Sequence, residues 1–174
     1  EAKKINLDPA TQAGLIAKAD YYHYEVQSNA EEILNDAVKS GVRVMIVAGY
    51  EIQRTPLVEN MDNNSDATVD TKYASAGATV ALLGETLGEN YEAVGTYCSD
   101  PTHNHLSPDG VVDATTGLLP CTTWYFKAQA HEQLPENDVA LGLAIRAMTD
   151  NNMKDVYSNP AYPQFNEGRL TYNA

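Results

Sequence analysis

The sequence is poor in basic residues. It has 11 lysines and arginines against 24 aspartates and glutamates, which gives a formal net charge of −13 at pH 7. The basic residues are scattered and form no stripe interleaved with aromatic residues. Because such a chain repels phosphate backbones and anionic lipid headgroups, we expect no nucleic-acid partner.

Long hydrophobic runs are also missing. The longest apolar stretch, Val44 to Ala48, is far shorter than the roughly 20 residues that cross a bilayer, so we expect no transmembrane segment. No signal-peptide pattern is present, and because the sequence begins at Glu1 rather than at Met, we expect that an N-terminal segment has been removed. The remaining composition, 43% hydrophobic and 20% charged over 174 residues, is that of one compact globular domain.

Cysteine is scarce, and the two that occur are Cys98 and Cys121. Prolines and glycines between them indicate a loop with little apolar core of its own. A crosslink stabilises such a loop, so we predict a disulfide and, with it, a secreted or otherwise extracytoplasmic location. Two unrelated buried thiols are the alternative.

The clearest local signal is a helix followed by a strand. Ser28 and Glu31 match a capping box, apolar residues recur at helical spacing up to residue 38, and Gly41 suits a left-handed helix stop. The apolar run 42–48 then predicts a buried strand that ends at Gly49. This succession is typical of an α/β protein with a mostly parallel, helix-covered sheet.

Other elements complete the expected order. Asp8 and Pro9 predict the start of a short helix. We further predict a helix over 74–83, a long loop over 84–121 with a short strand from Val111, a core strand over 122–126, and an amphipathic helix over 135–148. We divide the chain into a helical or linker segment (1–27), an α/β segment (28–150) with the loop insertion 84–121, and a surface-wrapping tail (151–174).

Two polar residues follow predicted core strands. Asp66 lies in the loop after the first strand, and His131 comes just after the second. Loops beyond the carboxyl ends of parallel strands lie at one edge of the sheet, so these side chains can meet. A buried carboxylate fixes the tautomer of an imidazole, and the two residues therefore predict an acid–base pair. Asp70 is a competing acid, and the structural alternatives are a turn-forming aspartate and a hydrogen-bonded histidine.

These segments resemble the last third of α/β-hydrolases, particularly secreted lipase-like and lecithin–cholesterol-acyltransferase-like members. Residues 42–49 are similar to the late strand before the acid loop, residues 65–69 (Ser-Asp-Ala-Thr-Val) to the family's Gly-Asp-Gly-Thr-Val segment, and residues 124–131 to the last strand and the histidine loop. The resemblance implies that Asp66 is the acid and His131 the base of a catalytic triad, in the C-terminal portion of an α/β-hydrolase sheet.

Two features of that family are missing. Ser65 and Ala67 replace the glycines around the acid, and the chain has neither a Gly-x-Ser-x-Gly nucleophile elbow nor a His-Gly-Gly oxyanion loop. The resemblance therefore implies that the nucleophilic serine lies on a missing N-terminal segment or on a partner chain. It also implies a small-molecule carboxylic ester or lipid as the substrate, no cofactor, and no activity of the chain alone.

A second cluster is Asp100, His103 and His105, whose imidazoles and carboxylate are suitable zinc ligands on an extended stretch. Asp109 or Asp113 would complete a four-ligand site, and either histidine is also an alternative base.

A different class of function is a secreted binding or structural module. The disulfide loop and tyrosine-rich stretches would then form a contact surface, and Asp66 and His131 would be incidental. Substitution of His131 by alanine should leave the function of such a module unchanged, which distinguishes it from the hydrolase. A third possibility is a metal-dependent enzyme that uses Asp100, His103 and His105, and elemental analysis tests it.

Overall fold

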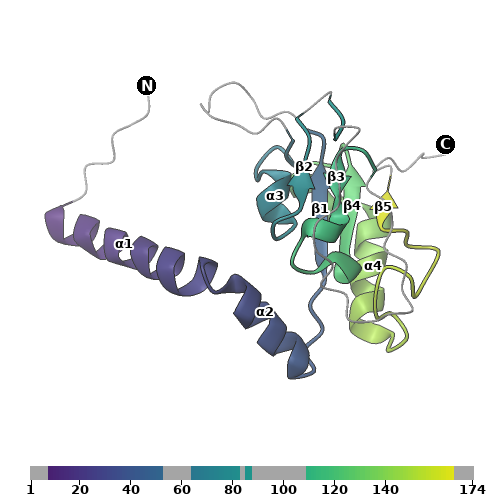
Figure 1. Cartoon of the computed structure of the whole chain (residues 1–174), viewed down its shortest axis with the longest axis horizontal. Coiled ribbons are helices and arrows are strands. Elements are labelled where there is room, and N and C mark those ends of the chain that lie inside the picture. Colours follow the sequence, from purple (N-terminus) through teal and green to yellow (C-terminus); the bar gives the residue numbers. More distant parts are fainter. Residues whose placement is uncertain (1–7, 53–63, 83–84, 88–108, 167–174) are drawn as a thin grey trace. The chain divides into compact units, whose positions relative to one another are not determined.

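The computed structural model describes residues 8–52, 64–82, 85–87 and 109–166 of the chain. The chain divides into two compact units, with the boundary between Val44 and Met45. The first unit contains helical elements, and the second contains the sheet and the elements that cover it (Figure 1). The α/β segment predicted over 28–150 thus begins within the first unit and ends within the second.

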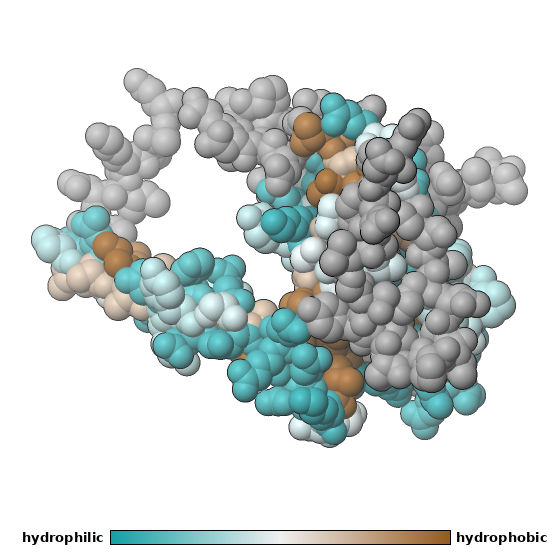
Figure 2. Space-filling view, viewed as in Figure 1, coloured by the Kyte–Doolittle hydropathy of each residue, from teal (hydrophilic) through white to brown (hydrophobic). Residues whose placement is uncertain are grey.

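The first unit begins with helix α1 (Pro9–Tyr21), which starts where the sequence predicts and runs further than the short helix expected. The Asp8 carboxylate accepts hydrogen bonds from the backbone N–H groups of Ala10 and Thr11, both at 3.1 Å. Helix α1 continues into the π-helical turn η1 (Tyr22–Gln27), and α2 (Ala30–Lys39) follows. None of the residues in these elements is fully buried, and apolar side chains are exposed along α1 (Figure 2).

The predicted capping box at Ser28 is wrong. Ser28 has helical backbone angles (φ −68°, ψ −21°), and its hydroxyl donates to the carbonyl of Tyr24. The N-cap of α2 is instead Asn29. A capping box needs an extended residue at a fresh helix start, and here the preceding helical turn runs directly into that position. The predicted stop at Gly41 is confirmed, because its φ is +81°.

The second unit is built on a three-stranded sheet. Its strands are β1 (Ile46–Tyr50), β4 (Thr123–Lys127) and β5 (Phe165–Asn166), in the order β1-β4-β5, and both pairings are parallel. Ile46 lies opposite Thr123, and Tyr125 lies opposite Phe165. Both predicted core strands form, although the first begins at Ile46 rather than at Val42, which is 55% exposed. The α/β class with a parallel sheet is confirmed.

Alternate residues of β4 face two separate cores, as the pleat of a strand requires. Trp124 and Phe126 pack with Leu143 of α4 (Asp138–Thr149). Tyr125 packs on the other face with Ala48 and Val112. The elements that complete the unit are α3 (Thr71–Ala74), β2 (Thr79–Val80), β3 (Val112–Asp113), η2 (Ala114–Thr116), η3 (Pro120–Thr122) and η4 (His131–Glu136), with β2 and β3 paired antiparallel.

Two predicted elements are wrong. The helix expected over 74–83 does not form: α3 ends at Ala74, Ala76 (φ +56°) and Gly77 (φ +104°) adopt left-handed angles that a helix cannot contain, and Thr79–Val80 is the strand β2. The tail does more than wrap the surface, since Met153 and Val156 are only 1% and 5% exposed and belong to the α4 core. The tail also supplies β5, which is the third strand of the sheet.

The predicted disulfide involves Cys98, which lies outside the described residues. Cys121 lies in η3, and no disulfide is seen in the described part of the chain. Most of the predicted loop insertion is likewise outside the described ranges. Among the helices that the structure does describe, none has the length and apolar character to cross a membrane.

Candidate active site

Asp66 lies in a tight turn that follows β1. One carboxylate oxygen, Oδ1, accepts hydrogen bonds from the backbone N–H groups of Thr68 (3.0 Å) and Val69 (2.7 Å). The Asp66 N–H in turn donates to the carbonyl of Val69 at 3.0 Å. The residue is 1% exposed, so its carboxylate is buried and held by its own turn.

His131 meets this carboxylate at its second oxygen. The distance from His131 Nδ1 to Asp66 Oδ2 is 2.7 Å, and the His131 backbone N–H also donates to the Asp66 carbonyl at 2.8 Å. In the neutral imidazole, a carboxylate that accepts at Nδ1 places the ring proton on Nδ1 and leaves a lone pair on Nε2. The imidazole side chain is 56% exposed, and no described residue forms a hydrogen bond with Nε2.

Gly49, near the end of β1, allows the two loops to come together. A Cβ atom at this position would lie 2.1 Å from the backbone carbonyl oxygen of Gln129 and 3.0 Å from the Asp66 Cβ. Real Cβ atoms essentially never make the first of these contacts. The absence of a side chain at Gly49 therefore sets the spacing between the strand, the acid turn and the loop that leads to His131.

Asn64 ties the acid turn to the end of β1. Its side chain is fully buried, and Oδ1 accepts hydrogen bonds from the Glu51 N–H (2.7 Å) and the Thr71 hydroxyl (3.0 Å). Next to it, the Ser65 hydroxyl donates to the carbonyl of Ile52 at 2.8 Å. Ser65 thus holds the chain together and has no hydroxyl proton left for catalysis.

The loop that carries His131 is held by side-chain amides. The side-chain amide of Gln129 donates to Oε1 of Gln133 (3.1 Å), and its own Oε1 accepts from the side-chain amide of Asn137 (2.8 Å). Asn137 also caps α4, since its Oδ1 accepts from the N–H groups of Val139 and Ala140. The histidine loop is consequently anchored to the first turn of α4.

Residues with left-handed backbone angles cluster around the site. Glu51 (φ 62°) follows β1, Ala67 (φ 72°) follows the acid, and Ala128 (φ 53°) precedes the histidine loop. A left-handed conformation costs a residue with a Cβ about 1–2 kcal/mol. Residues in such conformations are concentrated at active sites and ligand clamps, where the surrounding structure enforces them.

The competing acid Asp70 and the two aspartates proposed as metal ligands, Asp109 and Asp113, stand in other environments. The Asp109 carboxylate accepts from the Tyr50 hydroxyl at 2.7 Å and from two N–H groups in its own turn. Asp113 accepts from the N–H of Thr115, and Asp70 stands at the start of α3. Of the candidate acids, Asp66 is the one whose carboxylate contacts the imidazole of His131.

The proposed metal ligands Asp100, His103 and His105 lie outside the described residues. Within the described ranges, no group of three or more histidine, cysteine, aspartate or glutamate side chains is arranged to hold a metal ion. The described remainder of that candidate set, Asp109 and Asp113, is engaged in the turns above.

Sequence reasoning did not identify Gly49, Asn64 or Gln129 as parts of the site. Gly49 carried a usable signal, because a glycine inside a buried strand often marks a close backbone approach. The roles of Asn64 and Gln129 depend on contacts between distant segments and have no local signature.

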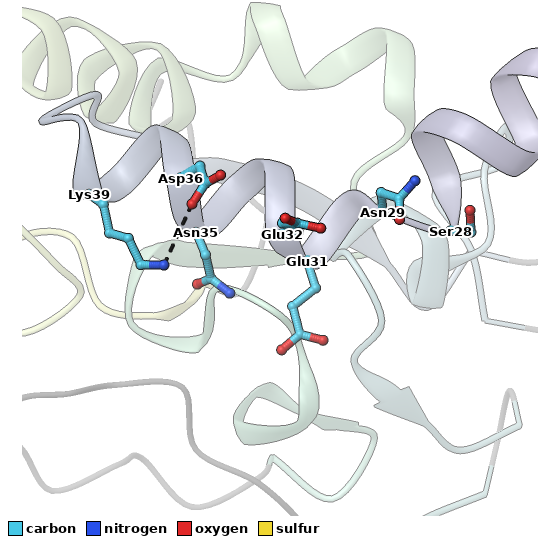
Figure 3. A pocket seen from close by; sticks show the side chains of 7 residues that line it. All are labelled: Ser28, Asn29, Glu31, Glu32, Asn35, Asp36 and Lys39. Carbon is cyan, nitrogen blue, oxygen red and sulfur yellow. Dashed lines mark ion pairs between the residues drawn. The ribbon is translucent and has the colours of Figure 1, made fainter.

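A polar hollow of about 380 Å³ lies on α2 in the first unit. Figure 3 shows Asp36 and Lys39 pointing toward each other, with 3.5 Å between the Lys39 Nζ and an Asp36 carboxylate oxygen. The lining residues are Ser28, Asn29, Glu31, Glu32, Asn35, Asp36 and Lys39. They include none of the candidate catalytic residues, and most are solvent-exposed, so this hollow is a charged helix surface.

Comparisons with protein-family models, with curated proteins and with solved structures found no match for the chain. The contact between Asp66 and His131 is therefore the feature from which a function can be inferred.

Proposed function

We propose that Asp66 and His131 are the acid and the base of a serine hydrolase of α/β-hydrolase type that acts on a carboxylic ester or a lipid-like substrate. The observation that carries the proposal is the 2.7 Å contact between a buried carboxylate and a half-exposed imidazole. The half-exposed imidazole leaves Nε2 accessible to a nucleophile and a substrate.

The arrangement suits general acid–base catalysis. Asp66 holds the proton on Nδ1, so Nε2 accepts the hydroxyl proton of a serine as the serine oxygen attacks the substrate carbonyl. The protonated imidazole is stabilised by the buried carboxylate and then donates the same proton to the leaving alcohol. Water repeats the cycle on the acyl-enzyme and regenerates the serine.

The positions of the two residues in the fold support the same function. Asp66 and His131 follow β1 and β4, which are adjacent parallel strands, and functional groups of parallel sheets lie beyond the carboxyl ends of the strands. The acid precedes the histidine in the chain, as in α/β-hydrolases. We assign the nucleophilic serine to a preceding segment or to a partner chain.

The test uses protein isolated from its natural source, together with the polypeptides that co-purify with it. A fluorophosphonate probe labels an activated serine, and mass spectrometry locates the label. We expect a labelled serine outside these 174 residues. The labelling rate should fall about a thousandfold or more in His131→Ala and in Asp66→Asn, because loss of the base or of its orienting acid removes activation of the hydroxyl.

Matched controls are available in the chain. His23 is exposed and hydrogen-bonded to Gln27 in the other unit, so His23→Ala should leave labelling unchanged, as should Asp70→Asn. Absence of any label, or labelling that is indifferent to His131→Ala, would leave the binding module as the better account. A label on a serine of this chain would overturn the assignment of the nucleophile to another segment.

A further inference from the structure

Helix α4 has apolar side chains on two sides, and only one of these sides packs in the core. Ala140 and Leu143 are buried against the sheet. Leu141, Ile145 and Met148 lie at spacings of four and three residues on a second side, where they are 47%, 48% and 75% exposed. Residues at this spacing form one stripe along a helix, so α4 has an apolar stripe that no described element covers.

The stripe continues into an apolar hollow of about 310 Å³. The residues that line it come from β1, η4 and α4 and are Val47, Leu134, Pro135, Ala140, Leu141 and Ala144. We call the stripe and this hollow together the β1–α4 face. Because every lining side chain is apolar, the face is suited to bury hydrophobic side chains.

Strand β1 adds an open hydrogen-bonding edge to this face. It is the first strand in the order β1-β4-β5, with β4 on one side and no described strand on the other. The Tyr50 carbonyl accepts from the Ala128 N–H, so Tyr50 turns its peptide groups toward β4. Alternate residues of a parallel strand turn to opposite neighbours, and the peptide groups of Val47 and Gly49 therefore point to the open edge.

The charged residues near the hollow indicate which kind of partner the face binds. Three exposed carboxylates, Glu132, Glu136 and Asp138, flank Leu134 and Pro135 along the chain, and none forms an ion pair with a described residue. A second copy of a chain with net charge −13 would be repelled. An apolar strand flanked by lysines or arginines matches the open edge, the apolar hollow and the exposed carboxylates that neighbour its lining residues in the chain.

We propose that the β1–α4 face binds such a strand of a partner polypeptide, and that this partner carries the nucleophilic serine. This inference rests on the proposed function. A strand that pairs parallel with β1 ends at the same edge of the sheet as β1 and β4, where Asp66 and His131 lie. The six-residue turn η4 begins at His131 and contributes Leu134 and Pro135 to the hollow, so docking and catalysis share one element.

The experiment places a photo-reactive phenylalanine analogue at position 141 of the full chain, in the presence of its co-purifying polypeptides. The control carries the same analogue at position 15, because Leu15 is 51% exposed and Leu141 is 47% exposed. We expect the probe at Leu141 to crosslink to an apolar strand with basic flanks, N-terminal to the fluorophosphonate-labelled serine, and the probe at Leu15 not to do so.

Failure of this inference and failure of the proposed function give different results. A label that depends on His131 without a crosslink from position 141 would overturn the docking proposal and leave the hydrolase intact. A crosslink to a polypeptide with no labelled serine would overturn the choice of partner, and so would a crosslink to a second copy or within the chain. A second variant, Ile145→Glu, should reduce recovery of the labelled partner at least tenfold relative to Leu15→Glu. Equal recovery with both would also overturn the proposal.

Discussion

Three donors surround the Asp66 carboxylate, namely two backbone N–H groups of its own turn and the imidazole of His131. These three donors satisfy the carboxylate without water. Two of them belong to the turn itself, so the turn holds the carboxylate independently of the histidine loop. This explains how a 1% exposed acid can orient a histidine whose side chain is 56% exposed. The carboxylate of Asp66 is buried, and the imidazole of His131 faces outward.

Gly49 is a position in the site where an added side chain does not fit. Replacing it with alanine places a Cβ 2.1 Å from the Gln129 carbonyl oxygen, so β1 or the histidine loop must move. We expect Gly49→Ala to lower the free energy of unfolding by about 2–3 kcal/mol, as measured by urea denaturation. Gly14→Ala is the control, because no atom lies within 4 Å of that Cβ and alanine favours the α1 helix. Equal stability of Gly49→Ala and the unmodified chain would contradict the packing described here.

Tyr125 predicts a response to alkaline pH. Its ring is fully buried, and burial raises the pKa of its hydroxyl far above the ordinary value of 10.0. No described group bonds this hydroxyl, and the nearby Ser75 hydroxyl donates to the Thr71 carbonyl at 2.6 Å. The folded pKa lies above the unfolded pKa, so this contribution to stability is complete below about pH 10 and is lost as the pH rises further.

Tyr125→Phe removes the titrating group and an unpaired hydroxyl. We expect its free energy of unfolding to be unchanged or up to about 1 kcal/mol higher at neutral pH. Above about pH 10 it should fall less steeply than that of the unmodified chain, which denaturation at a series of pH values would measure. A parallel decline of both proteins would show that Tyr125 does not cause the alkaline loss.

At the scale of elements, the C-terminal segment after α4 is a part of the core. Met153 is 1% exposed, whereas Met148 on α4 is 75% exposed. We expect Met153→Ala to cost about 2–4 kcal/mol of unfolding free energy, because it leaves a cavity beneath the sheet. Met148→Ala should change stability by less than about 0.5 kcal/mol. Thermal denaturation of the two variants makes the comparison, and similar melting temperatures would contradict the placement of the tail.

Elements with a local physical cause were predictable from the sequence. The start of α1, the stop at Gly41, and the strands β1 and β4 follow from capping chemistry, glycine and apolar runs. The tail was not, because Met153 and Val156 stand among polar residues and acquire their burial from distant strands. The sequence also singled out Asp66 and His131, which the structure brings into contact, while their catalytic role stays a prediction. Asn64 and Gln129 act through contacts that no local pattern encodes, whereas Gly49 carried a signal as a glycine inside a buried strand.

At the scale of the whole molecule, net charge governs stability and association in opposite directions. A chain with net charge −13 repels itself, and added salt screens that repulsion. We expect the melting temperature of the chain to rise as NaCl increases from about 20 mM to about 0.3 M. Over the same range its affinity for the proposed basic partner should fall at least about tenfold in titration calorimetry. If salt left both quantities unchanged, charge would not be a determinant of either.

The parallel pairing of β1 with β4 also has a consequence for how the protein is made. Ile46 pairs with Thr123, and the acid and the histidine are separated by 65 positions. Contacts between such distant segments form slowly, because a long loop must close before any of them forms. A ribosome-bound chain that ends before residue 131 cannot contain the pair at all. The nascent polypeptide must therefore extend past residue 131, and β4 must pair with β1, before the carboxylate of Asp66 and the imidazole of His131 can meet.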